Sequence, residues 1–241
     1  ISASPLVDGN KVIVCPGGPG AAVVALDAKS GKTMWKGGGS DLPGYATPVP
    51  ATLNGKRQYI VFTAYNLIGV DAANGRLLWS FPWKTQYDVN AATPVVIGSS
   101  VFITSGYGRG CALVDLASGK PVKRWENREI QSHFNTPVYS GGFLYSTSDP
   151  NNLVCLDAKS GRAVWKQRGF EKGGLIGVDG ALIVVDGAKG DVALVDMTPN
   201  GYKELGRVKP LGGSQSWAPP VLADGKLLVR NKRFLACLAL K

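Results

Sequence analysis

The stretch Val24-Ala25-Leu26-Asp27-Ala28-Lys29-Ser30-Gly31-Lys32-Thr33-Met34-Trp35 decides the fold, because altered copies of it return along the whole chain. Each copy has an aspartate after a short apolar run, and these aspartates are Asp27, Asp71, Asp115, Asp157 and Asp196. They are spaced 44, 44, 42 and 39 residues apart. A period near 40 residues that reads as strands is typical of β-propeller blades with four strands each. The repeat therefore predicts an all-β propeller.

A second marker, an apolar run led by proline, precedes most of these copies and supplies the inner strand. It reads Ser4-Pro5-Leu6, Thr47-Pro48-Val49, Thr93-Pro94-Val95, Thr136-Pro137-Val138 and Ala218-Pro219-Pro220-Val221, with Leu175-Ile176-Gly177-Val178 in its place in the fifth unit. Six blades are therefore predicted, and the sixth ends after its third strand. We expect one domain over residues 1–241 with blades at about 1–40, 41–86, 87–130, 131–170, 171–212 and 213–241, the last incomplete.

The repeated turn has a chemistry that explains its residue types. An aspartate at a strand end accepts hydrogen bonds from backbone N–H groups about two residues further on, and the glycine supplies a positive φ. The tryptophan on the fourth strand suits packing between adjacent blades, and its recurrence at one structural position favours packing over an aromatic ligand cage. The predicted docking residues are Asp27, Gly31, Trp35, Asp71, Gly75, Trp79, Asp115, Gly119, Trp125, Asp157, Gly161 and Trp165.

The charge balance of 27 Lys and Arg against 17 Asp and Glu gives a net charge of +10. One interpretation is a polyanionic partner. The other, which we favour, is that cations in and beside the repeated turns protect exposed sheet edges from pairing. Nucleic acid is an unlikely partner on this pattern, because the basic residues lack interleaved aromatics that would stack on bases. No apolar run approaches the roughly 18 residues that a membrane helix needs.

The four cysteines, at positions 15, 111, 155 and 237, form neither a CxxC motif nor an adjacent pair. We interpret them as small packing side chains. A disulfide between neighbouring repeats stays open as an alternative.

The pattern Ala-x-Asp-x-x-Ser/Thr-Gly-x-x-x-Trp is closely kept at Ala25–Trp35, at Asp71–Trp79 and at Asp157–Trp165. It resembles the tryptophan-docking repeats of pyrroloquinoline-quinone-like (quinoprotein-like) propellers. Leu6-Val7-Asp8-Gly9 and Ser105-Gly106-Tyr107-Gly108 are similar to BamB-like secreted propellers of planctomycete-type bacteria, as is Val192–Asp196. The resemblance implies a periplasmic or secreted protein with about eight blades and an export signal. Only Ile1-Ser2-Ala3 precede the first inner strand, so we expect a seven- or eight-bladed ring whose N-terminal blades and leader lie outside this sequence.

The same superfamily includes quinoprotein dehydrogenases, in which the resemblance implies a quinone beside two adjacent half-cystines and a calcium held by Glu and Asn. This sequence has no adjacent cysteines, and eight of its thirteen aspartates are assigned to turns. The remaining carboxylates form no paired motif for acid–base chemistry or a hard-cation site. They are Asp41, Asp88, Asp149, Asp186, Asp191, Glu126, Glu129, Glu171 and Glu204. We therefore predict no cofactor, no metal and no catalytic residue, and we lean against an enzyme.

Binding is expected in the loops that lead into the inner strands, because a rigid scaffold commonly carries its binding residues on loops. His133, the only histidine, lies in one of these loops, and we interpret it as an ordinary loop residue with no carboxylate neighbour. The candidate residues at the mouth of the central channel are Tyr45, Asn90, His133, Asn135, Lys172, Ser216 and Trp217.

The function predicted from these observations is a non-catalytic binding or scaffold propeller outside the cytoplasm, with a protein or peptide as partner. The alternative is an extracytoplasmic quinoprotein-type dehydrogenase, or a protein that binds or processes an anionic polysaccharide. Salt separates the two kinds of binding, because polyanion binding weakens as ionic strength rises.

Overall fold

The computed structural model describes residues 3–213 and 215–240. Ile1 and Ser2, counted above among the residues before the first strand, lie outside this range. The chain divides into two compact units, one up to Glu126 and one from Asn127 onward. The sheets of the two units are numbered as blades in chain order.

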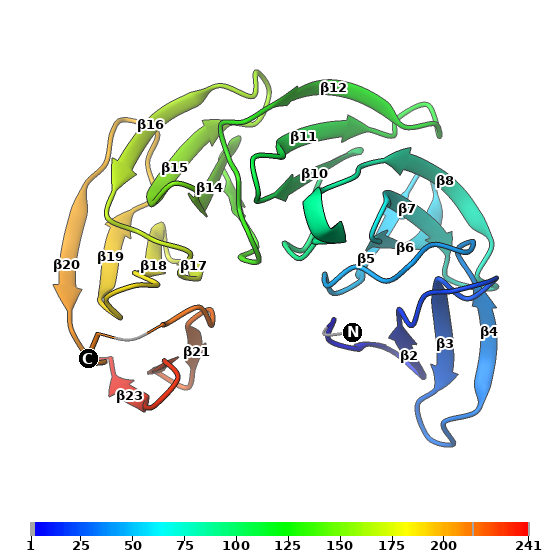
Figure 1. The fold of residues 1–241 in the computed structure, drawn as a ribbon, viewed down its shortest axis with the longest axis horizontal. Coiled ribbons are helices and arrows are strands. Elements are labelled where there is room, and N and C mark those ends of the chain that lie inside the picture. Colours follow the sequence, from blue (N-terminus) through cyan, green and yellow to red (C-terminus); the bar gives the residue numbers. More distant parts are fainter. Residues whose placement is uncertain (1–2, 214, 241) are drawn as a thin grey trace. The chain divides into compact units, whose positions relative to one another are not determined.

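The first unit contains three antiparallel sheets of four strands, each with its strands in chain order (Figure 1). Blade 1 has β1 (Leu6–Asp8), β2 (Lys11–Val14), β3 (Val23–Asp27) and β4 (Thr33–Gly37). Blade 2 has β5 (Val49–Leu53), β6 (Lys56–Phe62), β7 (Asn66–Asp71) and β8 (Leu77–Pro82). Blade 3 has β9 (Val95–Ile97), β10 (Ser100–Ser105), β11 (Gly110–Asp115) and β12 (Val122–Asn127), and a 3-10 turn at Gln86–Asp88 precedes it.

The second unit contains two sheets of four strands and one of three. Blade 4 has β13 (Val138–Ser140), β14 (Phe143–Ser148), β15 (Asn152–Asp157) and β16 (Ala163–Arg168). Blade 5 has β17 (Leu175–Val178), β18 (Ala181–Val185), β19 (Val192–Asp196) and β20 (Glu204–Val208). Blade 6 has β21 (Val221–Ala223), β22 (Lys226–Arg230) and β23 (Leu235–Ala239).

The prediction of six strand-built units is confirmed, and each predicted blade range contains one sheet. The sixth sheet has three strands among the described residues, and the boundaries of the blades stay a prediction. That residues 1–241 form one domain stays a prediction. Among the residues described, no helix is long and apolar enough to cross a membrane.

In blades 2 to 5 the second and third strands are the most buried, as expected for strands covered on both faces. In β11, all six residues from Gly110 to Asp115 are buried. Apolar clusters join neighbouring blades within each unit, and one of them places Trp79 of blade 2 against Val101 and Val114 of blade 3. Cys15, Cys111 and Cys155 are buried, and Cys237 is exposed. Burial raises the pKa of the Cys155 thiol to about 11, which suits a packing side chain.

The repeated aspartate closes its turn with the geometry that the sequence predicts. Asp27 Oδ1 accepts hydrogen bonds from the Ser30 amide at 2.8 Å and from the Ser30 hydroxyl at 2.7 Å. Asp157 Oδ1 accepts the same pair from Ser160, both at 2.6 Å. Gly31 follows with φ of +70°, a conformation that glycine adopts without strain. These bonds hold the pKa of Asp27 and Asp157 below the ordinary aspartate value, with the serine hydroxyl as the first cause.

The pKa shift of Asp157 predicts a pH effect on stability. A carboxylate whose pKa is lower in the folded state stabilises the fold above the unfolded pKa of about 3.9, and this contribution is lost as pH falls through the folded value. Wild type is therefore expected to lose about 1 kcal/mol more unfolding free energy than Asp157→Asn between pH 5 and pH 2.5. Denaturant unfolding over this pH range measures the difference.

The control for that experiment is Asp224→Asn, which removes the same charge from an exposed hairpin turn. No hydrogen bond to the Asp224 side chain is present among the described residues. If Asp157→Asn and Asp224→Asn have the same pH dependence, the effect is one of net charge and the turn hydrogen bonds do not contribute.

Candidate functional site

Three of the four repeated tryptophans contact either the next blade or another strand of their own blade, as follows. The ring of Trp35 in blade 1 lies over the turn of blade 2, so close that a Cβ on Gly75 would be 2.5 Å from it. Trp165 Nε1 in blade 4 donates a 2.9 Å hydrogen bond to the Thr198 carbonyl in the turn of blade 5. Trp125 lies against Phe102 with ring centroids 5.9 Å apart.

The register of the last two strands defines the tryptophan position in each blade. Trp35 pairs with Ala25, Trp79 with Gly69 and Trp165 with Cys155, and a β-bulge follows each pair. In blade 5 the same position, next to the same bulge, is occupied by Gly206, which pairs with Leu194. Blade 5 therefore has glycine where three other blades have an indole.

Two of the predicted channel-mouth residues, Tyr45 and Asn90, lie in the first unit. Tyr45 is 42% exposed, and its backbone N–H donates to the Asn90 carbonyl at 2.9 Å. Asn90 is fully buried, and its side chain is occupied by hydrogen bonds within the protein. Asn90 Nδ2 donates to the carbonyl of Thr63, and Oδ1 accepts from the Ser105 hydroxyl at 2.8 Å. Asn90 thus holds its loop, and its place at the channel mouth stays a prediction.

The other five predicted residues lie in the second unit, and most of them are buried. Ser216 is fully buried, and Asn135, 4% exposed, donates from Nδ2 to the Lys172 carbonyl at 2.8 Å. Lys172 itself is half-buried, with a φ of +41°. Trp217 is 40% exposed, and its ring packs on Phe134 with centroids 5.2 Å apart. Of these five, Trp217 offers the largest exposed side chain.

The expectation that His133 has no carboxylate neighbour was wrong. Its Nε2 contacts Asp149 Oδ2, which lies 16 residues further along the chain and belongs to no motif with His133. Asp149 follows β14, whereas His133 precedes β13, and the antiparallel pairing of these strands brings the two ends together. The His133 ring also lies edge-on to Phe134, with centroids 6.1 Å apart.

Trp217 forms one wall of a hollow of about 160 Å³ on blade 6. Arg230 and Lys232, at the end of β22 and just after it, line the hollow with Gln215. Both cations are exposed, and the described residues offer neither of them an ion pair. We call the group Phe134, Gln215, Trp217, Arg230 and Lys232 the Trp217 patch. Sequence reasoning included Trp217 in the candidate set but missed the two cations, because nothing in the repeat brings residues 230–232 to the loop at 217.

The hairpin that carries these cations is held by Asn231, which is 6% exposed. Asn231 Oδ1 accepts from the amides of Arg233 and Phe234 at 2.8 and 2.7 Å, and Nδ2 donates to the Gly212 carbonyl at 3.1 Å. The side chain therefore ties the β22–β23 turn to the loop before Trp217. This makes the Trp217 patch a surface on a fixed backbone.

The donor set that the dehydrogenase resemblance implies does not fit this chain. The sequence contains no adjacent cysteines. Within residues 3–213 and 215–240, three or more His, Cys, Asp or Glu side chains do not gather into a group that would hold a metal ion.

Comparison with known proteins agrees with this architecture. A family model described as outer membrane protein assembly factor BamB matches residues 1–167. The outer membrane protein assembly factor BamB of Nitrosomonas eutropha (strain DSM 101675 / C91 / Nm57) is 29% identical over 121 residues, which cover 50% of this chain and 28% of that protein. The lanthanide-dependent methanol dehydrogenase of Methylacidiphilum fumariolicum (strain SolV) is 24% identical over 144 residues, covering 55% and 23%. The chain spans about a quarter of the length of these curated relatives.

A solved structure extends the likeness along nearly the whole chain. The crystal structure of BamB from Moraxella catarrhalis matches with a TM-score of 0.73 at 17% identity, covering 97% of this chain and 67% of that one. At this identity the likeness shows the fold alone. The predicted quinoprotein-like β-propeller fold is confirmed by this match together with the family model.

Proposed function

The chain belongs to the family of the outer membrane protein assembly factor BamB, and from this premise we propose that it is a non-catalytic interaction module that binds a protein or peptide outside the cytoplasm. The family supports an interaction or scaffold role in general, and the outer membrane in its description supports the location. On this proposal, Trp35, Trp79, Trp125 and Trp165 dock blades together, and the loops present the binding surface. Tyr45 and Lys172 of the channel-mouth set remain candidates for that surface.

The observation that carries this proposal is the exposed Trp217 on a fixed loop. Tryptophan and arginine are the residue types most enriched among those that dominate binding energy at protein interfaces. In the Trp217 patch, an indole with 40% exposure lies beside Arg230 and Lys232. Such a surface suits a peptide that offers an apolar side chain and a carboxylate.

Trp217→Ala is expected to weaken peptide binding at least about tenfold, the loss typical of a residue at the centre of an interface. Peptides selected on the wild-type protein from a displayed random library, and then measured by calorimetry, give the affinities. Because the main contact is apolar, affinity is expected to fall only about two- to threefold between 50 and 500 mM salt, which is the part that the two cations contribute.

The matched control is Tyr139→Ala, which removes another aromatic side chain with 40% exposure in the same unit. Tyr139 lies on β13 and lines no part of the hollow beside Trp217. Equal losses for the two variants, or selection of no peptide at all, would contradict the proposed role of the Trp217 patch.

A second candidate function, binding of an anionic polysaccharide, is favoured by the two cations of the patch. Arg230 and Lys232 lie next to an indole on which a sugar ring can stack. Heparin and polygalacturonate serve as sulfated and uronic probes. Binding that Trp217→Ala and Arg230→Gln both weaken, and that disappears at 500 mM salt, supports this function over peptide binding.

A further inference from the structure

Four of the eight tyrosines in the chain lie in loops at one end of blades 2 and 3. Tyr45 precedes β5, Tyr65 joins β6 to β7, Tyr87 precedes β9, and Tyr107 joins β10 to β11. Because the strands of each blade are antiparallel and follow chain order, these four connections lie at the same end of their blades (Figure 1). Apolar clusters join blade 2 to blade 1 and to blade 3, all within the first unit. Blade 2, which carries most of these loops, therefore has a described blade on each side.

Three of these tyrosines are joined by direct contacts. The Tyr65 hydroxyl donates a 3.4 Å hydrogen bond to Asp88 Oδ2, and Lys84 Nζ lies 5.5 Å from the centre of the Tyr65 ring. Tyr87, which precedes Asp88, packs edge-on against Tyr107, with ring centroids 5.5 Å apart and ring planes at 79°. We call Tyr65, Tyr87 and Tyr107 the tyrosine surface.

Arg109 fixes the loop of Tyr107 to the loop of Tyr87. Its Nε donates a 3.0 Å hydrogen bond to the Lys84 carbonyl, and its guanidinium lies 3.4 Å from the centre of the Trp83 ring. Trp83 is fully buried. Because both loops are tied to this buried indole, the two exposed rings hold their relative position before a partner binds, which lowers the entropy cost of binding.

The backbone under the two rings has a conformation that bulky residues rarely adopt. The angle φ is +64° at Tyr87, +56° at Asp88 and +55° at Tyr107. Burial does not offset this strain, since Tyr87 is 70% exposed and Tyr107 is 44% exposed. Strained residues of this kind concentrate at binding and catalytic sites. The strain therefore indicates a role in binding for these two rings.

The charged groups around the rings are matched. Arg109 pairs with Glu126 at 2.6 Å, Asp88 accepts the Tyr65 hydroxyl, and Lys84 lies over the Tyr65 ring. The whole chain, by contrast, has a net charge of +10. A surface with matched charges suits an uncharged partner better than a polyanion.

We propose that the tyrosine surface binds a proline-rich segment of a partner polypeptide in the polyproline II conformation. Such segments dock on exposed aromatic rings, and they are already extended before binding, so they lose little conformational entropy. A polyproline II helix has three residues per turn, so its proline rings point in different directions and can meet two ring planes that lie at 79° to each other. The inference rests on the proposed interaction function and names a partner class for a second surface.

A neutral sugar fits the tyrosine surface less well. Sugar hydroxyls need polar side chains that orient them, in addition to a ring on which the sugar stacks. Here the Asp88 carboxylate already accepts from Tyr65, and the Arg109 guanidinium is held by Glu126 and by the Lys84 carbonyl. Proline rings need only apolar contact, and the carbonyls of a proline-rich segment can accept hydrogen bonds from tyrosine hydroxyls.

The test uses N-acetylated, C-amidated octaproline as the probe and the same peptide made of D-proline as its control. NMR follows the tyrosine ring resonances of the full chain during titration. With the L-peptide we expect saturable shifts of the Tyr87 and Tyr107 resonances and a dissociation constant below about 1 mM. The D-peptide has the same composition but the opposite helix hand, so we expect it to bind at least about fivefold more weakly. Because the probe is uncharged, its affinity should change less than about twofold between 50 and 500 mM salt.

Tyr87→Asn and Tyr107→Asn are each expected to weaken binding of the L-peptide at least about tenfold, because each removes an aromatic ring. Asparagine tolerates a left-handed φ, so the backbone of the loop is retained, and either variant serves if the other folds poorly. Tyr87→Phe keeps the ring and should bind within about threefold of wild type. Tyr139→Ala is the matched control, since Tyr139 is 40% exposed on β13 of the second unit, and it should bind as the wild type does.

Cellohexaose serves as a neutral sugar probe in the same titration, and we expect it to cause no saturable shifts. Tighter binding of cellohexaose than of octaproline would overturn the proposal in favour of a carbohydrate ligand. Absence of shifts with octaproline, equal binding of the D-peptide, or unchanged binding to both asparagine variants would also overturn it.

Trp217→Ala separates this inference from the proposed function of the Trp217 patch. It should bind octaproline as the wild type does, because Trp217 lies in the second unit. If Trp217→Ala loses octaproline and Tyr87→Asn retains it, the probe binds at the Trp217 patch, which overturns the tyrosine surface and leaves the proposed function standing. Conversely, the tyrosine surface stands if octaproline binds there while the peptides selected on the wild type are unaffected by Trp217→Ala.

Discussion

Replacing Trp79 with alanine is expected to lower the free energy of unfolding by about 4 kcal/mol, within the range of 3–5 kcal/mol for truncation of a buried aromatic residue. Trp79 is 8% exposed and packs in the apolar cluster that joins blade 2 to blade 3. Its Nε1 donates a 2.7 Å hydrogen bond to Gln58 Oε1, and Gln58 is itself buried. Alanine would leave a cavity between the blades and remove the donor that Gln58 depends on.

Two other variants separate the packing from the hydrogen bond. Trp79→Phe keeps most of the aromatic surface and loses the N–H donor, so its cost is expected to be about 1–2 kcal/mol. Trp217→Ala removes an indole that is 40% exposed and is expected to cost less than about 1 kcal/mol. Chemical denaturation followed by circular dichroism gives all three values. A loss below about 1.5 kcal/mol for Trp79→Ala would show that this tryptophan does not hold the two blades together.

The fold was predictable because the residues that form each turn and its two flanking strands are close together in the sequence and recur in every copy. Each turn from Asp to Gly spans only a few residues, and the strands before and after it pair within the same hairpin. Five copies of one pattern make the assignment of each element mutually consistent. The same locality explains why the three strands of blade 6 were predictable.

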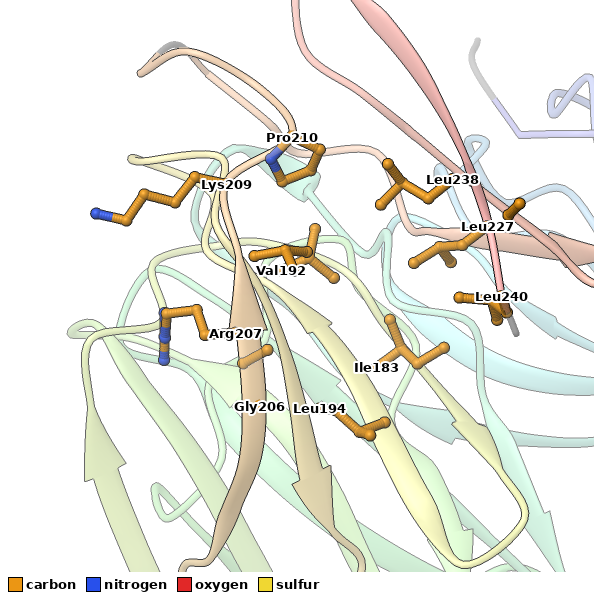
Figure 2. A pocket seen from close by; sticks show the side chains of 13 residues that line it. Ile183, Val192, Leu194, Gly206, Arg207, Lys209, Pro210, Leu227, Leu238 and Leu240 are labelled. Carbon is orange, nitrogen blue, oxygen red and sulfur yellow. The ribbon is translucent and has the colours of Figure 1, made fainter.

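The glycine at the tryptophan position of blade 5, which Figure 2 shows beside Leu194, was not predictable from the sequence pattern. In blade 5 the repeat aspartate Asp196 is followed by glycine after five residues and not after four, so the fourth strand is displaced relative to the other copies. Only the pairing of Gly206 with Leu194 shows that glycine takes the tryptophan position. The extra residue in the turn shifts Gly206 out of the sequence spacing seen in the other copies, and only the strand pairing shows that Gly206 corresponds to the tryptophans.

Long-range pairing also determined which candidate residues are available to a ligand. Asp149 reaches His133 because β13 and β14 pair, and Arg230 reaches Trp217 because the Asn231 side chain joins their loops. Loop position in the sequence identified residues near blade ends but did not distinguish buried from exposed ones. Asn90 and Trp217 occupy similar places in the repeat, yet the first is fully buried and the second is 40% exposed.

Asn90 therefore carries a prediction about stability. Its Nδ2 donates to the carbonyls of Thr63 and Ala64, at 2.9 and 3.1 Å, and its Oδ1 accepts from the Ser105 hydroxyl. Ser105 Oγ in turn accepts a 3.0 Å hydrogen bond from Trp83 Nε1, and Trp83 is fully buried. One amide side chain thus satisfies polar groups from blade 2 and blade 3, where water does not reach it.

Asn90→Ala is expected to lower the free energy of unfolding by about 3 kcal/mol, because each buried polar group left without a partner costs about 1–3 kcal/mol. Asn90→Asp has nearly the same shape but turns an acceptor toward the carbonyls of Thr63 and Ala64, so its cost at pH 7 should be at least as large. This order of the two variants is the diagnostic result, since a cost from lost volume alone would make Asn90→Asp the milder change. Thermal and denaturant unfolding at pH 7 measure both. A mild Asn90→Asp, or unchanged stability in both variants, would show that Asn90 does not hold the two blades.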